Sequence, residues 1–275
     1  MSIKSNKFRH QSGQAVLIVL LSLSVVLIIV LYIMSRSVTD ISLSSKEEDS
    51  MRAFSAAEAG IERALVIGTG GSGSFGDANF SANVSDFAKS ASSVTYPISL
   101  SSGEIATFWF SRPSEPVFDG NQVKVCWGAK NTVANDSFTP AVELSVYYLE
   151  SGVYKIQRVA LDPNSNRAIP NHFTIPSSGS CTIGTDEFQF YNTVSLPTSV
   201  TLKYMTAKIL YNSNATHKIG IDVSSTASLL PSQGVKVNAD GSYSSSNRSI
   251  EVYQLYPVAP SIFMNSVFSS TGITK

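Results

Sequence analysis

The sequence has little of what enzyme active sites are usually built from. Among its 275 residues are only three histidines and two cysteines, and charged residues make up 15%. His172 and His217 are isolated among polar residues, and His10 lies in a basic N-terminal segment. No G-x-S-x-G or H-E-x-x-H motif occurs, so neither a serine nucleophile nor a zinc-protease helix is indicated. We therefore expect a protein that is not an enzyme and has no metal site.

The charge balance also argues against a nucleic-acid partner. Lysine and arginine together number 20, and so do aspartate and glutamate, which gives a formal net charge of zero. Leaving out Lys4, Lys7 and Arg9 at the N-terminus gives 17 basic against 20 acidic residues, or −3. A domain that binds nucleic acid normally carries a basic face. We expect no nucleic-acid binding.

Helix-breaking residues are missing from a long N-terminal stretch. Between Gln14 and Ile67 there is no proline, and Gly60 is the only glycine. Residues 15–34 are almost purely apolar, broken only by two serines. At ~1.5 Å of rise per residue, about twenty residues form a helix of ~30 Å, which matches the core of a lipid bilayer. The sequence predicts one long helix over residues 14–67, with its first part in the membrane and its second part amphipathic.

The segment before the apolar run carries a processing signal. Residues 1–13 include two lysines, an arginine and a histidine but no acidic residue, so the N-terminus is predicted to stay on the cytoplasmic side. Gly13 ends this basic segment and Gln14 begins the helix. The arrangement resembles the type III leader of type IV pilins, which a membrane peptidase removes while the helix is retained. The resemblance implies a cut between Gly13 and Gln14, followed by N-methylation of Gln14.

A second element extends the resemblance. Residues 47–65 read EEDSMRAFSAAEAGIERAL, which is similar to the signature after the membrane span in PilX-like minor pilins and their secretion-system relatives. Leader and signature together cover about the first fifth of the chain. The resemblance assigns a role in assembly to the signature residues Phe54, Ala57, Glu58, Ala59 and Gly60.

Ile18 departs from the pattern of the major pilins. These carry a glutamate as the fifth residue of the mature chain, and counting from Gln14 this position is Ile18. A carboxylate inside a bilayer is costly and persists where it has a partner. Isoleucine removes both the cost and the pairing, so the resemblance implies a minor, tip-proximal or assembly-initiating subunit.

The resemblance thus implies a structural subunit of a type IV pilus. Its partners would be the prepilin peptidase, the lipid bilayer, other pilins and the pilus assembly machinery, with cell adhesion at the fibre tip as a further role. It would lie in the cytoplasmic membrane with its head outside, and at the cell surface once assembled. A secretion pseudopilus and a DNA-uptake fibre fit the same elements. The alternative is a static single-pass anchored adhesin or receptor that is never polymerised.

Apolar residues recur at helical spacing beyond the membrane run. Ile41, Met51, Phe54, Ile61 and Leu65 fall roughly on one face of the helix. We expect the last turns, residues 54–65, to dock on the chain's own head, and the earlier turns to pack between subunits.

The helix is predicted to end at a glycine-rich linker. Residues 68–76 read GTGGSGSFG, and glycine favours the left-handed geometry of a helix end. No lysine-serine or lysine-threonine pair follows, so a phosphate-binding loop is not indicated. We expect residues 68–93 to form a flexible connector and a short helix or irregular segment.

From residue 94 the hydrophobic period changes to two, which is typical of strands. The expected strands are residues 94–100, 105–110, 123–127, 142–149, 153–161, 188–194, 200–211, 218–223 and 250–256. Residues 150–152 are predicted to form a hairpin turn and residues 212–216 a second turn. The expected fold class is α+β: the long helix followed by an antiparallel β-rich head over residues 94–275, as a sheet or a sandwich without helical crossovers. The apolar tail, residues 262–268, is expected to pack on the head or to bind a partner.

Two features of the head bear on its stability and ligands. Cys126 and Cys181 lie in the exported part, where either one disulfide or two buried thiols would be stable. Residues 162–166 resemble the start of a calcium loop, but Arg167 stands at the sixth position and Phe173 at the twelfth instead of glycine and glutamate. We expect a polar turn there and no cofactor, with calcium on the head as an unsupported alternative.

Overall fold

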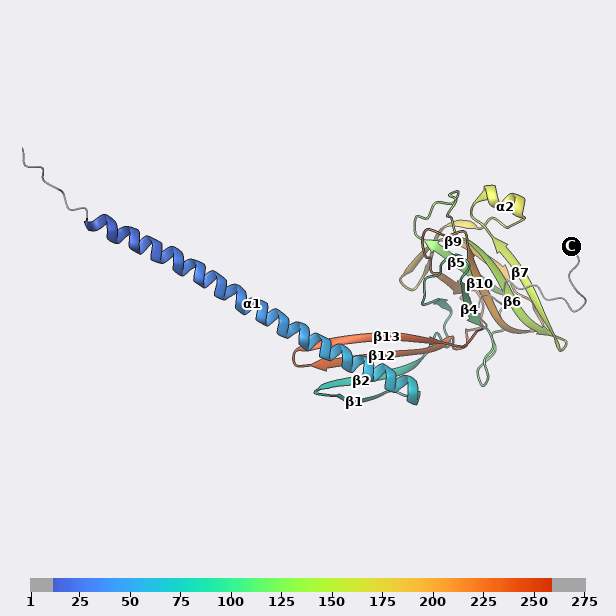
Figure 1. Cartoon of the computed structure of the whole chain (residues 1–275). Helices are drawn as coiled ribbons and strands as arrows, with labels where there is room; N and C mark the ends of the chain where they lie inside the picture. Colours follow the sequence, from blue (N-terminus) through green and yellow to red (C-terminus); the bar gives the residue numbers. More distant parts are fainter. Residues whose placement is uncertain (1–11, 259–275) are drawn as a thin grey trace, which may run out of the picture. The chain divides into compact units, whose positions relative to one another are not determined.

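The computed structural model describes residues 12–258 and shows an α+β fold, one long helix followed by antiparallel sheets (Figure 1). The predicted fold class is confirmed. The described residues form two compact units, which we name the helix unit (residues 12–83 and 238–250) and the sandwich unit (residues 84–237 and 251–258). Most of the predicted leader and the apolar tail at residues 262–268 lie outside the described residues.

The helices are α1 (Ser12–Ile67) and α2 (Ser165–Asn171). The strands are β1 (Gly71–Phe75), β2 (Ala78–Phe87), β3 (Ser93–Thr95), β4 (Ile105–Trp109), β5 (Gln122–Ala129), β6 (Ala141–Glu150), β7 (Val153–Leu161), β8 (Ser177–Ile183), β9 (Asp186–Ser195), β10 (Thr201–Leu210), β11 (Ile219–Asp222), β12 (Gly234–Tyr243) and β13 (Ser246–Leu255). They form three sheets in the orders β1-β2-β12-β13, β4-β10-β6-β7 and β3-β11-β5-β9-β8.

Helix α1 is long and apolar enough to span a membrane from Ala15 onward. Every side chain over residues 15–34 is exposed. The hydroxyls of Ser22 and Ser24 donate to the carbonyls of Val19 and Leu20 at 2.9 Å, so the polar groups of the run are bonded within the helix itself. This internal pairing is what a helix in hydrocarbon needs, because lipid offers no hydrogen-bond partners.

The end of α1 was predicted correctly. Gly68 has a φ of 76°, and its N–H donates to the carbonyl of Ala64 at 2.8 Å. Glycine reaches this left-handed conformation without the steric penalty of a side chain. The helix therefore ends at Ile67, and it begins at Ser12, two residues before the predicted start.

The prediction of a linker and an irregular segment over residues 68–93 is wrong. β1 and β2 pair there as an antiparallel hairpin in which Phe75 lies opposite Ala78. In β2 the side chains of Ala78, Phe80 and Ala82 are buried, and the residues between them are exposed. The alternation was missed because small residues give a weak contrast between the two faces of a strand.

The sandwich unit has one core between two sheets. Phe108, Val146 and Met205 from the β4-β10-β6-β7 sheet share a buried cluster with Trp127 and Phe190 from the β3-β11-β5-β9-β8 sheet. Two sheets packed face to face over a common core define a β-sandwich. Of the two expected arrangements, a sheet or a sandwich, the structure therefore has the sandwich.

The predicted turns have different outcomes. β6 and β7 form the expected hairpin, with Glu150 opposite Val153 and positive φ values at Ser151 and Gly152, as a tight hairpin requires. Residues 212–216 do connect β10 to β11, but these strands belong to different sheets. Sequence reasoning also missed β8, which is rich in serine and glycine, as well as β12 and the short helix α2.

Candidate functional site

The predicted processing junction lies at the beginning of α1. Gly13 and Gln14 belong to its first turn, since the helix starts at Ser12. Ile18 follows one turn later and is 64% exposed, within a continuous apolar surface that extends to Met34. An exposed apolar surface of this length indicates contact with lipid or with other proteins.

The second half of α1 packs on its own sheet through small residues. The side chains of Ala53, Ala56, Ala57 and Ala64 are between 0% and 2% exposed, and Gly60 is buried as well. The spacing of three and four residues places all five on one face of the helix, which we name the alanine face. Three members of the AAEAG signature, Ala56, Ala57 and Gly60, therefore contribute to a contact within the chain.

The sheet meets the alanine face with a glycine. A Cβ atom added to Gly241 of β12 would lie 1.9 Å from the carbonyl oxygen of Ala53 and 2.6 Å from the amide nitrogen of Ala57. At Gly60 an added Cβ would lie 3.0 Å from the ring of Phe80. The backbones of helix and strand are thus so close at Gly241 that no side chain fits between them.

This geometry gives a prediction with a built-in control. We expect Gly241→Ala to destabilise the docking of α1 on its sheet by about 1–3 kcal/mol, because overpacking forces the backbone apart. Gly71→Ala, in the same unit, should have little effect, since an added Cβ there meets no atom within 4 Å. Hydrogen exchange of the amides of residues 53–64 measures the difference, with an expected increase in rate of about 5- to 150-fold for Gly241→Ala alone. Equal exchange in both variants would contradict the close approach.

The last turns of α1 do dock on the sheet, but the large apolar residues expected to make the contact are largely wrong. Ile61 is buried, at 7% exposure, whereas Phe54 and Leu65 are 46% and 36% exposed. Met51, in the turns expected to pack between subunits, is 66% exposed. Because the sheet presents Gly241 to the helix, it accommodates alanines better than large side chains. Met51, Phe54, Glu58 and Leu65 instead form an exposed row away from the sheet, which we name the outer stripe.

A hollow of about 430 Å³ lies between the outer stripe and the β1–β2 turn. It is lined by Glu48, Met51, Arg52 and Ser55 of α1 and by residues 75–78. Arg52 donates to Glu48 at 2.7 Å, lies 3.8 Å from Asp77 and stacks 5.0 Å from the ring centre of Tyr243. The hydrogen bond with Glu48 raises the pKa of the Arg52 guanidinium. Arg52 therefore connects α1 to Asp77 in the β1–β2 turn and to Tyr243 in β12.

The two cysteines form a disulfide. Cys126 on β5 is bonded to Cys181 on β8, and both are buried beside Ile183 and Phe188. The bond closes a sequence separation of 55 residues. Of the two states that the sequence left open, the structure has the cross-link.

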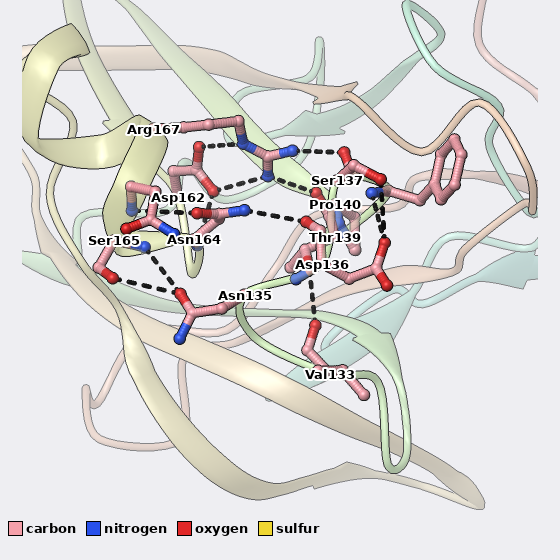
Figure 2. Close-up of polar contacts among 12 residues, drawn as sticks. Val133, Asn135, Asp136, Ser137, Thr139, Pro140, Asp162, Asn164, Ser165 and Arg167 are labelled. Atoms are coloured by element: carbon pink, nitrogen blue, oxygen red, sulfur yellow. Dashed lines mark hydrogen bonds and ion pairs between the residues drawn. The ribbon is translucent and has the colours of Figure 1, made fainter.

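In the segment that resembled a calcium loop, an arginine side chain occupies the place that a calcium ion would take (Figure 2). Arg167 donates its Nε–H to Asp162 Oδ2 at 3.0 Å and an Nη2–H to Oδ1 at 2.9 Å. The same guanidinium donates to the carbonyls of Ser137 and Thr139, each at 2.7 Å. The carboxylate of Asp162 is fully buried and already forms an ion pair with Arg167, so it is not free to bind calcium.

The rest of this segment begins a helix. Asn164 caps α2, its side chain accepting the N–H of Asn166 at 3.0 Å, as expected for a helix N-cap. The expected polar turn is therefore a capped helix start. Over residues 12–258 no group of three or more His, Cys, Asp or Glu side chains is suited to hold a metal ion.

His217 has a structural position in the sandwich unit. It is buried, its Nδ1 accepts the N–H of Ala129 at 3.2 Å, and its backbone pairs with Leu100. Burial lowers the pKa of the imidazole, which favours the neutral form that can accept this bond. His172 ends α2 in the left-handed conformation, with a φ of 57°.

Comparison with known proteins found no matching family model, no matching curated protein and no matching solved structure. The functional inference therefore depends on the sequence elements and on the geometry of α1.

Proposed function

We propose that this protein is a structural, non-catalytic subunit of a type IV pilus, a PilX-like minor pilin that is cleaved between Gly13 and Gln14. The observation that carries the proposal is the construction of α1. An entirely exposed apolar half continues without a break into a half whose alanine face is covered by the chain's own sheet. Such a helix serves first as a membrane anchor and then as a stem that supports a folded head.

Assembly would exchange one apolar environment for another. In the bilayer, residues 15–34 contact lipid, and in a fibre the same residues would contact neighbouring helices. Apolar burial changes little in this exchange, so the fibre depends on close packing and on the assembly machinery. Ile18 fits this role without the costly carboxylate found at this position in major pilins.

The outer stripe supports a polymerised subunit over a static anchor. A static anchor needs no exposed apolar side chains outside the membrane, yet Met51 and Phe54 are exposed well beyond the apolar run. The proposal assigns the alanine face to docking within the chain and the outer stripe to contacts with other pilins. Phe54 and Glu58 of the signature belong to the outer stripe, whereas Ala57 and Gly60 belong to the alanine face.

Mass spectrometry of the mature N-terminus tests the proposal. In a host with prepilin peptidase we expect a chain that starts at N-methylated Gln14, and in a host without it a chain that keeps residues 1–13. In the host with the peptidase, Gly13→Asp should abolish the cut, while Gly71→Ala, a matched glycine change elsewhere, should leave it intact. A wild-type chain that keeps its N-terminal segment in the presence of the peptidase would favour the static membrane-anchored adhesin instead.

A further inference from the structure

Strand β7 has one edge that is not paired with another strand. It is the last strand of the β4-β10-β6-β7 sheet and pairs with β6 over its whole length without a bulge (Figure 1). At its C-terminal end the other edge is covered, because Thr174 exchanges backbone hydrogen bonds with Ala160 and Asp162 at 2.9 and 3.0 Å. Residues 153–159 have no such cover among the backbone bonds of the described chain.

The backbone groups that point to this edge can be identified. The carbonyl of Ala160 and the N–H of Asp162 are directed away from β6, toward Thr174. Backbone direction alternates along a strand that is paired on one side. The N–H and carbonyl groups of Tyr154, Ile156 and Arg158 therefore point to the open edge.

The side chains along the edge are unusually apolar for an unpaired strand. Val153, Tyr154 and Ile156 are 58%, 76% and 48% exposed. The charges that could keep other strands away are paired within the hairpin, Lys155 with Glu150 and Arg158 with Glu143. A long, flat and apolar edge strand is a site for pairing with another chain.

Other edge strands of the described sheets lack this combination. β3 and β4 have three and five residues, β8 is interrupted by an irregularity after Ser178, and β1 contains two glycines. β13 is as long as β7, but its exposed residues are polar. Length, regularity and exposed apolar side chains occur together at β7.

Pairing of β7 with itself has one favourable register. A two-fold axis at Ile156 uses all of residues 153–159, since Val153 then lies opposite Val159, Tyr154 opposite Arg158, Lys155 opposite Gln157 and Ile156 opposite itself. An axis at Lys155 or at Arg158 would place like charges opposite each other, which is destabilising. An axis at Gln157 would leave only residues 155–159 of each strand paired before the Thr174 cover begins.

We propose that two copies of this chain associate through β7, antiparallel about a two-fold axis at Ile156, so that their sheets become one. Tyr154, Ile156 and Arg158 of each copy exchange about six backbone hydrogen bonds with the other. On the outer face, the cross-strand row of Trp109, Tyr204, Tyr147 and Ile156 continues into the second copy. Tyr154 lies beside the partner's Arg158, a favourable pair of ring and cation. The inference depends on the sandwich unit alone and is independent of processing at Gly13.

Single cysteines placed along β7 test the register. The full chain in detergent micelles is oxidised mildly; Cys126 and Cys181 are already bonded to each other. Ile156→Cys should give a disulfide-linked dimer, because its two copies lie opposite at about 5.5 Å between Cα atoms. Tyr154→Cys and Arg158→Cys should each form no intermolecular disulfide alone, since like positions are then about 13 Å apart along the strands, and should cross-link when the two variants are mixed. Absence of the Ile156→Cys dimer, or equal cross-linking of all three variants, overturns the proposal.

A charge substitution tests the association without new cysteines. Ile156→Lys places two ammonium groups opposite each other. Sedimentation in the same detergent should show that the dissociation constant of the dimer rises about 100-fold. Ile98→Lys, a matched change at an isoleucine that is 57% exposed outside β7, should leave association unchanged. Because both positions are exposed, both variants should keep wild-type circular dichroism. A dimer that persists in Ile156→Lys, as contacts through α1 would produce, refutes the β7 interface.

Discussion

Replacing Arg167 with methionine is expected to lower the free energy of unfolding of the sandwich unit by about 3–5 kcal/mol, because the change leaves a buried carboxylate without its counter-charge. Asp162 is 0% exposed and makes two hydrogen bonds with the guanidinium. Methionine can fill the space of the arginine stem, so the loss comes mainly from the charge and its hydrogen bonds.

The effect should spread beyond the ion pair. Arg167 also donates to the carbonyls of Ser137 and Thr139, in the segment between β5 and β6 (Figure 2). The next residue in that segment, Pro140, accepts the indole N–H of the buried Trp127 at 2.9 Å. Since Trp109 and Trp127 are the two tryptophans of the chain and both lie in the sandwich unit, fluorescence during chemical denaturation reports on this unit.

Two companion variants make the result interpretable. Arg158→Met removes an arginine whose side chain is 62% exposed and 4.0 Å from Glu143, and it should change stability by less than about 1 kcal/mol. Adding Asp162→Asn to Arg167→Met should restore part of the loss, because the buried charge is then gone. If the exposed and the buried arginine variants lose equal stability, the ion pair does not hold this region together.

Removal of the disulfide is expected to have a comparable effect, a loss of about 4 kcal/mol in the free energy of unfolding. The estimate follows from the 55-residue separation of Cys126 and Cys181, because the cross-link restricts a loop of that length in the unfolded chain. The double variant Cys126→Ala and Cys181→Ala should show it in denaturation followed by tryptophan fluorescence. Reduction of the wild-type chain provides the control without any change of sequence.

Thiol titration supplies the independent check. Under denaturing conditions without reductant, no reactive thiol should be found, and after reduction there should be two. Two thiols before reduction would contradict the bond between β5 and β8, and the double variant should then lose only the contacts of two small buried side chains.

Local sequence was sufficient for the parts of the fold that depend on neighbours along the chain. The absence of helix breakers up to Ile67 and the glycine at residue 68 predicted where α1 ends. Residues 150–152, between two strand patterns, predicted the β6–β7 hairpin, and in the structure Ser151 and Gly152 adopt the positive φ of such a turn. The hairpin of β1 and β2 was not predicted, because its alternating residues are mostly alanine, serine and asparagine, which give a weak contrast between the two faces of a strand.

The candidate site also has some features that the local sequence predicts and others that depend on tertiary contacts. The leader, the apolar run and the AAEAG signature were visible in the sequence, and they led to the prediction of a pilin-like subunit. The face of α1 that packs on the sheet was predicted from large apolar side chains in the last turns. That rule selected Phe54, Ile61 and Leu65, of which Phe54 and Leu65 are exposed.

The sequence by itself determined a long helix with a bilayer-length apolar half, its end, and a head made of antiparallel strands. The tertiary structure decided that alanines cover the docking face, that Cys126 bonds to Cys181, and that the guanidinium of Arg167, rather than a metal ion, lies beside Asp162. The physical reason is that burial depends on the surface a segment meets. For α1 that surface includes Gly241, whose missing side chain admits the helix backbone, and nothing in residues 53–64 records the presence of a glycine so far away in the chain.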